Sequence, residues 1–494
     1  MFKKLLCSSL IFVGSLSVNS WAVDTNLKYL PNEADWLNHA KELEKFWVMP
    51  EAYGNPVGNF PTWRCNNGKL RNEQKCPEEF KAPDFLPYTK YNFVRMISRQ
   101  TFGYGALFNL TGNPELLRLH KAGVNYLIKE AKDPQGGFYS IISKDGEKLP
   151  PQLERTSQDV AYALLGLSMN AYLTNDPEVL KIIEETYDYI YNTYYDPQKN
   201  LLKWVLEDSE FDKKEQVELV AQLDQLNAYL LLCWRLVPPK NQAKWTKTIQ
   251  NTIKMINDNF YQKDKNIFLG CTHSESCKEV FTGRHLDYGH RIKTFWMEYL
   301  VSLGLGDEQL KEFAQKGMIE TLDKALTLNK YEWFESDTSD EASWWVAAEL
   351  DQASLTLALA RVKKMPDTLF NWIENRVDHE YGELNDGLKT HPWRNAYHST
   401  EHALIGYITT QGIRAQYCKR STGCLKDNQV DLYFAPKDIS KNLILTPYIF
   451  SGSIKNMKIN NKEDGIYKVT FEKIGLPQKI NKVESYKFEE KAKK

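Results

Sequence analysis

The chain has 494 residues, 42% of them hydrophobic and 13% aromatic, so it can bury a large core as two domains or as one large repetitive domain. Its 63 Lys and Arg residues nearly balance its 64 Asp and Glu residues, which excludes the basic surface that nucleic acid binding requires. Beyond the N-terminal segment no run is long and apolar enough to span a bilayer.

Residues 1–22 have the pattern of a cleaved export signal. Lys3 and Lys4 precede an apolar run over residues 5–18, and Ser20-Trp21-Ala22 offers small residues at a cleavage site. We therefore expect a protein that is exported to the periplasm or secreted.

The rest of the chain contains a series of segments with apolar residues at helical spacing. We expect twelve helices, which form six consecutive pairs. They cover residues 35–49, 93–108, 114–131, 156–171, 177–194, 217–236, 242–260, 288–303, 308–326, 343–361, 367–376 and 397–411.

Two connections between these segments are near copies of each other. Residues 110–115 read Leu-Thr-Gly-Asn-Pro-Glu, and residues 173–178 read Leu-Thr-Asn-Asp-Pro-Glu. Each ends one helix and begins the next, with Asn113 or Asp176 as the N-cap and proline at the first helical position. Repeated helical hairpins indicate a closed (α/α)6 barrel whose inner helices surround a central cavity, with an open solenoid as the alternative.

The pattern changes after Gly412. Residues 453–459 and 466–474 alternate apolar and polar side chains across a turn, as two short strands do. We therefore expect an all-α (α/α)6 barrel domain over residues 27–425. A small β extension over residues 426–494 would follow it, without chemistry of its own.

Six of the eight cysteines fall into close pairs, which in an exported chain are typical of small disulfide loops. Their spacings differ from the C-x2–4-C of zinc sites, which is the rival interpretation. Cys233 lies in an apolar run and is expected to be a buried thiol. The expected disulfides are Cys65–Cys76, Cys271–Cys277 and Cys418–Cys424.

The stretch Asp287–Leu300 places a histidine beside the expected start of a helix. Ile292, Trp296 and Leu300 recur every four residues and mark one packed face, while His290 falls in the first turn. A histidine in that position can exchange protons near neutral pH. The alternative is a structural histidine that is hydrogen-bonded at a helix end.

Six motifs in order along residues 35–411 resemble those of the N-acylglucosamine 2-epimerase family. This family includes cellobiose 2-epimerases and aldose-ketose isomerases that act on mannose-like sugars. The motifs are the opening helix and loop at residues 36–69, Arg99-Gln-Thr-Phe-Gly-Tyr104, the turn at residues 133–139, Tyr288-Gly-His-Arg-Ile-Lys293 with Trp296, Ser343-Trp-Trp345 with Ala348-Glu349, and Trp393-Arg-Asn-Ala-Tyr-His398.

The resemblance implies an epimerase or aldose-ketose isomerase that transfers protons at C2 of a reducing mono- or oligosaccharide, without a metal or other cofactor. One histidine removes the C2 proton of the open-chain sugar, another returns a proton, and an arginine stabilises the oxyanion. By position these residues are His290, His398 and Arg99. We expect the protein to be a monomer or a homodimer. The residues expected to bind the substrate or shape its pocket are Asp224, Lys293, Trp345, Glu349, Trp393 and Tyr397.

Three positions depart from the family pattern. Lys293 stands where the family has glutamate, Asp224 lies where it has an H-x-H-x-x-E helix, and Glu401 stands where arginine often follows the last motif. Like-charge repulsion from Lys293 would disfavour a protonated His290, unless Asp224 or another carboxylate pairs with the lysine.

Three other interpretations remain open. His398-Ser-Thr-Glu401-His402 reads H-x-x-E-H, a zinc motif when it lies on a helix and a third ligand follows. Carboxylates on the inner helices could instead serve a glycoside hydrolase, as acid and base, or be buried ion-pair partners. The third possibility is a sugar-binding protein without catalysis. The carboxylates are Asp159, Asp224, Glu349 and Glu401.

Overall fold

The computed structural model describes most of the chain beyond residue 29. The expected export signal and Cys424 lie outside the described residues. The described ranges are 30–71, 76, 89–143, 155–206, 216–272, 277, 285–327, 332–339, 342–418 and 429–488.

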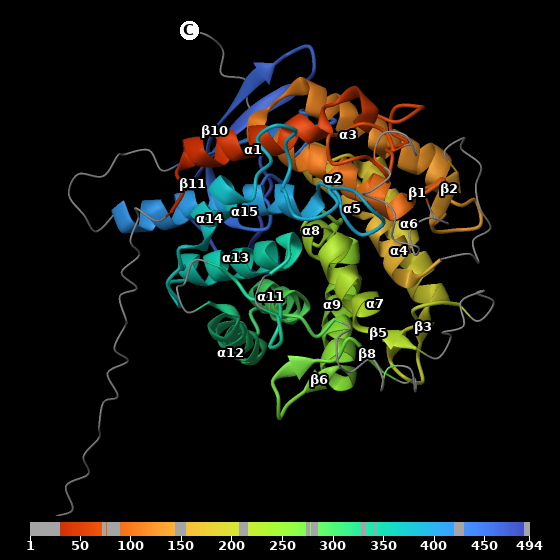
Figure 1. Ribbon diagram of the computed structural model, residues 1–494, viewed down its shortest axis with the longest axis vertical. Coiled ribbons are helices and arrows are strands. Elements are labelled where there is room, and N and C mark those ends of the chain that lie inside the picture. The colour runs from red at the N-terminus through yellow and green to blue at the C-terminus, as the bar shows by residue number, and fades with distance from the viewer. Residues whose placement is uncertain are drawn as a thin grey trace, which may run out of the picture.

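Helices in two concentric layers form most of the molecule (Figure 1). The inner layer consists of α2 (Val94–Thr111), α4 (Ser157–Ala163) with α5 (Leu165–Thr174), α7 (Leu219–Gln225) with α8 (Leu231–Cys233), α11 (Tyr288–Leu305), α13 (Trp344–Leu359) and α15 (Tyr397–Cys418). The outer layer consists of α1 (Glu33–Trp47), α3 (Pro114–Tyr126), α6 (Pro177–Thr193), α9 (Pro239–Asn259), α12 (Glu308–Ala325) and α14 (Thr368–Asn375).

Burial separates the two layers. Every residue of α2 from Val94 to Leu110 is buried, whereas α6 buries Val179, Ile183 and Ile190 along one face. The last inner helix, α15, packs against both α13 and α2, so the ring closes. This closure confirms the predicted (α/α)6 barrel and contradicts the open solenoid.

The predicted helix starts are made by the expected caps. The side chain of Asn113 accepts a hydrogen bond from the Glu115 amide at 3.0 Å, and that of Asp176 accepts one from the Glu178 amide at 3.0 Å. Proline occupies the first turn of both following helices, α3 and α6. A prolyl nitrogen has no hydrogen to leave unsatisfied at that position, so the caps and prolines together set the hairpin boundaries.

One inner helix expected to be continuous is interrupted at Leu164, between α4 and α5. The hydroxyl of Ser98 on α2 donates to the Ala163 carbonyl at 3.0 Å and accepts from the Gly166 amide at 2.8 Å. It therefore takes the place of a helical backbone partner for both groups, which accounts for the interruption. A second inner segment is also irregular, because a π-helical turn, Leu226–Leu230, separates α7 from α8.

Short two-stranded ribbons connect several helices. They pair β1 (Tyr91–Phe93) with β2 (Ile141–Ser143), β3 (Tyr195–Asp196) with β4 (Leu201–Leu202), β5 (Val217–Glu218) with β8 (Cys271–Thr272), and β6 (Tyr261–Gln262) with β7 (Ile267–Phe268).

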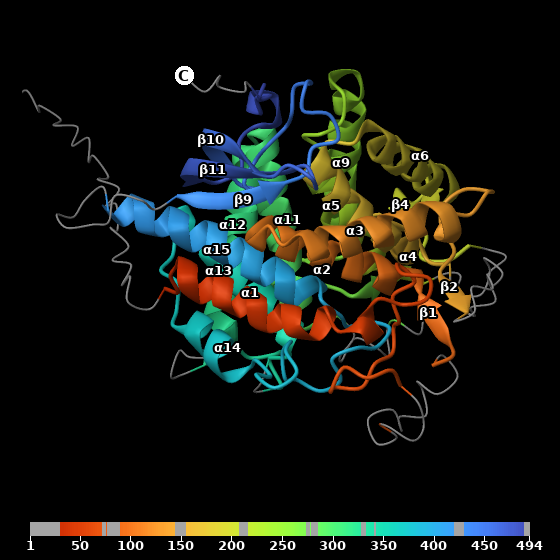
Figure 2. The same ribbon diagram turned by 90° about the horizontal axis from the view of Figure 1, so that it is seen from above.

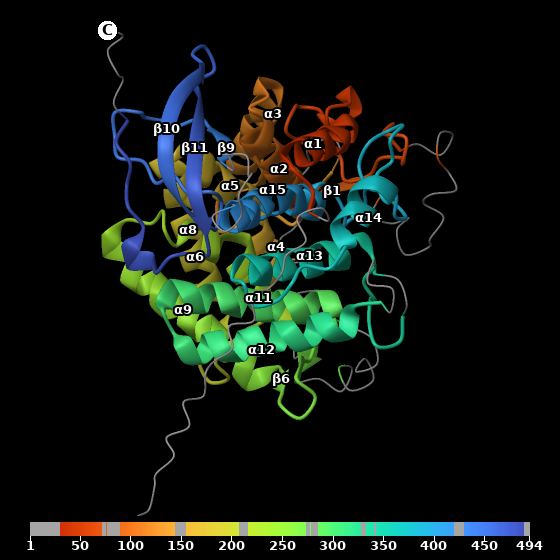
Figure 3. The same cartoon turned by 90° about the vertical axis from the view of Figure 1, so that its left-hand side faces the viewer.

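The C-terminal extension is an antiparallel sheet of three strands, in the order β10 (Ser451–Asn461), β11 (Ile466–Gly475) and β9 (Val430–Phe434). Two of these strands were predicted, and β9 was missed. Strand β11 packs against α15, and β9 packs against α2 and α5. Figures 2 and 3 show the sheet on one side of the barrel, beside α15, and Figure 2 shows α14 on the opposite side.

The extension covers the C-terminal ends of inner helices. The Ala435 amide donates to the carbonyl of Leu173 at the end of α5, and the side chain of Asn109, near the end of α2, donates to the Tyr433 carbonyl. The hydroxyl of Tyr448 reaches further and donates to the buried carboxylate of Glu401 at 2.7 Å. The extension therefore reaches into the polar interior of the barrel through one hydroxyl.

Two disulfides, Cys65–Cys76 and Cys271–Cys277, are formed as expected from their spacing. Cys233 is a free buried thiol, and burial raises its pKa to about 12. None of the helices within the described ranges has both the length and the apolar character needed to cross a membrane.

Candidate active site

A cavity of about 720 Å³ opens where the inner helices begin. Each inner helix contributes to its wall from its first two turns, so helix N-termini surround the cavity. The aligned peptide dipoles give these ends partial positive charge, which favours anions or developing negative charge. The helix residues in the wall include Arg95 and Arg99 of α2, Gln158, Asp159 and Tyr162 of α4, Val220 and Asp224 of α7, His290 and Lys293 of α11, Trp344 and Trp345 of α13, and His398 of α15.

Arg99, the expected oxyanion partner, lies in this wall. Its Nη1 donates to the Trp393 carbonyl at 2.8 Å, and its guanidinium lies 4.0 Å from the centroid of the Tyr162 ring. These contacts fix the position of Arg99 without neutralising its charge. Among the described residues, no carboxylate lies within 4.0 Å of its guanidinium. Arg99 therefore supplies positive charge to the cavity.

Trp393 lies at the mouth of the cavity and is 47% exposed. The guanidinium of Arg95 lies 3.8 Å from its ring centroid, and Arg95 also forms a buried ion pair with Asp159. The indole therefore packs on the Arg95 guanidinium and exposes apolar surface to solvent. Asp159, a candidate carboxylate in the hydrolase interpretation, is an ion-pair partner.

His398 begins α15 and is held by Glu349 of α13. Its Nδ1 lies 3.0 Å from Oε1 of Glu349, and both side chains are buried. Burial holds the pKa of His398 well below its ordinary value, and the positive charges of Lys293 and Arg99 lower it further. The imidazole is therefore neutral. With the proton on Nδ1, it donates to Glu349 and leaves a lone pair on Nε2.

Glu349 itself is 1% exposed, and burial raises its pKa. It was expected to bind substrate, as was Tyr397, but neither belongs to the cavity wall. Tyr397 is buried, its hydroxyl donates to Asn227 at 3.0 Å, and its ring lies 4.5 Å from that of His398. Both residues contact His398, Glu349 through its carboxylate and Tyr397 through its ring.

Lys293 lies between two carboxylates. Its Nζ is 3.7 Å from Oδ1 of Asp224 and 3.7 Å from Oε1 of Glu349. Burial alone would lower the pKa of Lys293, but Tyr162 and the surrounding carboxylates outweigh burial and raise it. The lysine is therefore charged. The condition set by the sequence is met, because Asp224 does pair with it.

Asp224 also accepts hydrogen bonds from Gln158 at 2.7 Å and from the hydroxyl of Tyr162 at 3.0 Å. It is 3% exposed and forms part of the wall. Asp224 thus links α4, α7 and α11 through one carboxylate, whose oxygens are occupied by three donors.

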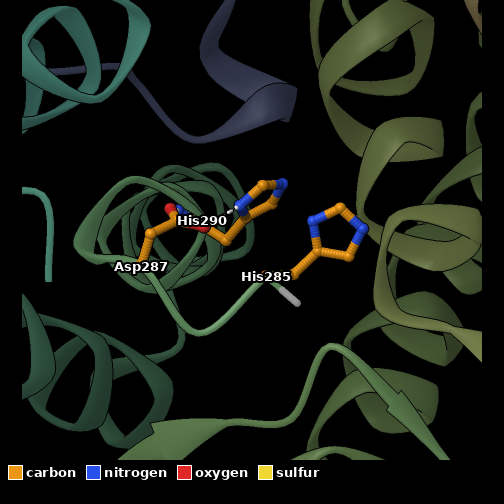
Figure 4. Close-up of side chains that lie close together, drawn as sticks. All are labelled: His285, Asp287 and His290. Atoms are coloured by element: carbon orange, nitrogen blue, oxygen red, sulfur yellow. Dashed lines mark hydrogen bonds and ion pairs between the residues drawn. The ribbon is translucent and has the colours of Figure 1, made fainter. Parts of the chain in front are cut away.

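His290 is oriented by Asp287, the N-cap of α11. Oδ1 of Asp287 accepts from the His290 amide at 2.8 Å, and Oδ2 lies 2.7 Å from Nδ1 of the imidazole (Figure 4). His285 lies beside it, with 4.2 Å between the ring centroids. The sequence interpretation used neither Asp287 nor His285. The capping pattern Asp-x-x-His could have revealed the first, but no local signal reveals the second.

Trp345 connects the two expected catalytic histidines. Its ring centroid lies 4.7 Å from that of His290 and 5.9 Å from that of His398. The structure therefore brings His290 and His398, from α11 and α15, to one indole in the same cavity. Both rings belong to the described cavity wall.

The H-x-x-E-H pattern does not form a common site. His398 contacts Glu349, whereas Nε2 of His402 lies 3.0 Å from Oδ2 of Asp351 in the core. Glu401 accepts from Tyr448, and burial together with the nearby Glu349 raises its pKa to about 7. The zinc interpretation of this motif is therefore wrong.

The sequence model of the N-acylglucosamine 2-epimerase (GlcNAc 2-epimerase) family matches residues 84–391. Among solved structures, the cellobiose 2-epimerase from Spirochaeta thermophila is 19% identical, with a TM-score of 0.55 over 66% of this chain and 88% of its own. A D-mannose isomerase is 15% identical, with a TM-score of 0.60 over 76% and 97%.

The fold is shared more widely. The unsaturated glucuronyl hydrolase from Bacillus sp. GL1 is 9% identical, with a TM-score of 0.54 over 77% of this chain and 97% of its own. A comparison with curated protein sequences finds no match. The family match spans more than half of the chain and includes residues of five inner helices around the cavity. The chain therefore belongs to the N-acylglucosamine 2-epimerase family.

Proposed function

We propose that this protein epimerises or isomerises a reducing sugar by proton transfer at C2. The observation that carries the proposal is the pair of imidazoles, His290 and His398, which contact one indole, Trp345, in the wall of one cavity. Membership of a family named for a sugar 2-epimerase supports this assignment.

The reaction requires a base, an acid and a site for negative charge. His398 is kept neutral by burial and by Lys293 and Arg99, so its Nε2 can accept the C2 proton of an open-chain aldose. As the C2–H bond breaks, its electrons form the C1–C2 double bond and the carbonyl oxygen becomes an oxyanion. Arg99 and the helix N-termini stabilise that charge.

Return of the proton decides the product. Delivery from His290 to the opposite face of C2 gives the epimer. Delivery to C1, with the proton of the C2 hydroxyl passing to the C1 oxygen, gives the ketose. The contact between His290 and Asp287 holds the imidazole in place for either transfer. Because His290 and His398 lie on different helices and contact Trp345 from different positions, the two rings can serve different faces of the substrate.

Lys293 and Asp224, which depart from the family pattern, also take part in the proposed site. The ammonium is fixed by two carboxylates and adds positive charge beside His398. Trp345 and the exposed face of Trp393 offer apolar surfaces on which the C–H faces of sugar rings can pack. We propose a mono- or oligosaccharide as the substrate on these grounds.

Glycoside hydrolysis is less well supported. It requires a carboxylic acid and a carboxylate that both face the bond to be cleaved. In the described wall, Asp159 is paired with Arg95, Asp224 is paired with Lys293, and Asp386 accepts from the Trp344 amide. Each carboxylate therefore has a structural partner.

The compartment is also part of the proposal. The N-terminal export pattern and the two local disulfides support a periplasmic or secreted protein, because disulfides persist in oxidising compartments.

Deuterium exchange tests the function. The mature protein would be incubated in heavy water with mannose, N-acetylmannosamine or cellobiose, while NMR follows deuterium at C2. We expect incorporation that is lost in His290→Ala and in His398→Ala and is retained in His379→Ala, whose side chain is 64% exposed. Exchange that survives both cavity substitutions would contradict the mechanism. A folded protein that exchanges none of the sugars and cleaves glycosides would favour the hydrolase.

A further inference from the structure

Three side chains at the start of α11 form a cluster that proton transfer uses only in part. His285, Asp287 and His290 each offer one nitrogen or oxygen, and these three atoms lie within 4.8 Å of one another. All three side chains are half-buried, and both histidines belong to the cavity wall. Figure 4 shows the two imidazoles side by side, with a nitrogen of His285 facing the His290 ring.

The donor set is one that transition metals prefer. Two imidazoles and a carboxylate bind Zn²⁺ and related divalent ions, and three protein ligands leave a coordination position open for water. No other group of three His, Cys, Asp or Glu side chains in the described ranges comes together this closely. The cluster is therefore chemically distinct from the paired carboxylates elsewhere in the cavity.

The backbone and a neighbouring carboxylate hold this arrangement. His285 has a φ of 56°, which is uncommon for a residue other than glycine, and this conformation places its ring beside His290. The carboxylate of Glu218 is fully buried and lies 3.7 Å from Nε2 of His285. Its negative charge favours a proton on that nitrogen, which leaves the lone pair of His285 on Nδ1.

We propose that His285, Asp287 and His290 bind one divalent transition metal ion, with Zn²⁺ as the best fit, and that the bound ion inhibits the enzyme. The inhibition rests on the proposed function, whereas the site does not. A neutral imidazole has a single lone pair, so the ion binds the nitrogen of His290 that carries no proton, and the ring keeps one proton on its other nitrogen. With that lone pair held by the ion, His290 can neither accept nor deliver the proton at C2, so the transfer stops.

Metal binding is tested first without substrate. The mature protein, treated with a chelator and dialysed, would be titrated with Co²⁺, whose visible absorption reports coordination by nitrogen and oxygen ligands. We expect one Co²⁺ per chain, displaced by one equivalent of Zn²⁺. The informative variant is His285→Asn, because asparagine tolerates a positive φ but has no imidazole. We expect its affinity to fall at least about tenfold, and that of His379→Ala to stay at the wild-type value.

The second part measures inhibition. Saturating Zn²⁺ should slow C2 exchange by the wild type at least about tenfold. At lower Zn²⁺ concentrations, the loss of rate should follow the fraction of the site that Zn²⁺ takes from Co²⁺. A chelator should restore the rate. At the same Zn²⁺ concentration His285→Asn should retain most of its own metal-free rate. Glu218→Gln, which keeps the shape of the orienting side chain, should weaken Co²⁺ binding less than His285→Asn does.

The outcomes separate the site from the function. A wild-type protein that shows no Co²⁺ absorption, or one whose affinity is unchanged in His285→Asn, overturns the site. Binding at this site with exchange that is unchanged or faster overturns the inhibition. If no sugar exchanges even without metal, the proposed function fails, while the Co²⁺ titration still decides whether the site exists.

Discussion

Nδ1 of His398 lies 3.0 Å from Oε1 of Glu349, and the two side chains come from neighbouring inner helices, α15 and α13. The contact fixes which imidazole nitrogen faces the cavity. It also places a carboxylate behind the ring, where a positive charge forms when the ring accepts a proton.

Glu349→Gln should lower kcat about 10- to 100-fold with little change in KM. The amide can still accept from Nδ1, but it cannot stabilise the imidazolium as a carboxylate does. Steady-state NMR kinetics on an exchanging sugar would measure both constants. Glu298→Gln is the matched control, since Glu298 is a buried glutamate of α11 outside the cavity wall. A Glu349→Gln enzyme with wild-type kcat would show that Glu349 only fills space.

Lys293→Met should move the acid limb of kcat/KM to higher pH. Lys293 is one of the charges that lower the pKa of His398, so its removal raises that pKa and protonates the base at a higher pH. A shift of about one pH unit is expected for the loss of a charge at this range. The pH profile between 4 and 8 would measure it. Lys316→Met, at a lysine whose side chain is 78% exposed, should leave the limb in place.

Trp393→Ala should raise KM about three- to tenfold and leave kcat nearly constant, because the indole offers binding area at the mouth and no reacting group. The conservative variant Trp393→Phe should recover most of the affinity. Comparing cellobiose with mannose would locate the contact, since a larger effect on the disaccharide places its second ring on the indole. A lower kcat with unchanged KM would instead give Trp393 a role at the reacting carbons.

Glu298 should make the protein less stable as the pH rises. Burial raises the pKa of Glu298 to about 8, against an ordinary value of 4.5. The folded state therefore keeps a proton that the unfolded chain loses, and this contribution disappears between these two pH values at about 1.4 kcal/mol per pH unit. Urea denaturation from pH 5 to 8 should show this slope in the wild type and a shallower one in Glu298→Gln. Parallel slopes would mean that Glu298 is not buried in solution.

The helical pairs could be predicted because their determinants are local. Apolar spacing, the caps Asn113 and Asp176, and the following prolines all act within a few residues. The break at Leu164 could not be predicted, because its cause is Ser98 on another helix. Strand β9 was missed because it is only five residues long and follows the barrel without a paired turn signal.

The same distinction divides the cavity. The positions of His290 and His398 follow from the starts of their helices together with the family pattern. The sharing of Lys293 by Asp224 and Glu349 depends on how three helices pack, although the sequence did suggest the first partner. His285 could not be identified at all, since it lies outside the helix and no local pattern predicts that its ring lies beside that of His290.

The C-terminal sheet has a kinetic consequence. It covers the ends of α2 and α5, whereas the cavity opens at the other ends of the inner helices. Sugar and product that use the mouth beside Trp393 share one route, so neither can occupy the cavity while the other is leaving. Product inhibition should accordingly be competitive. In a reversible reaction between sugars of similar stability, the net direction would then be set by which of the two sugars is consumed by other reactions.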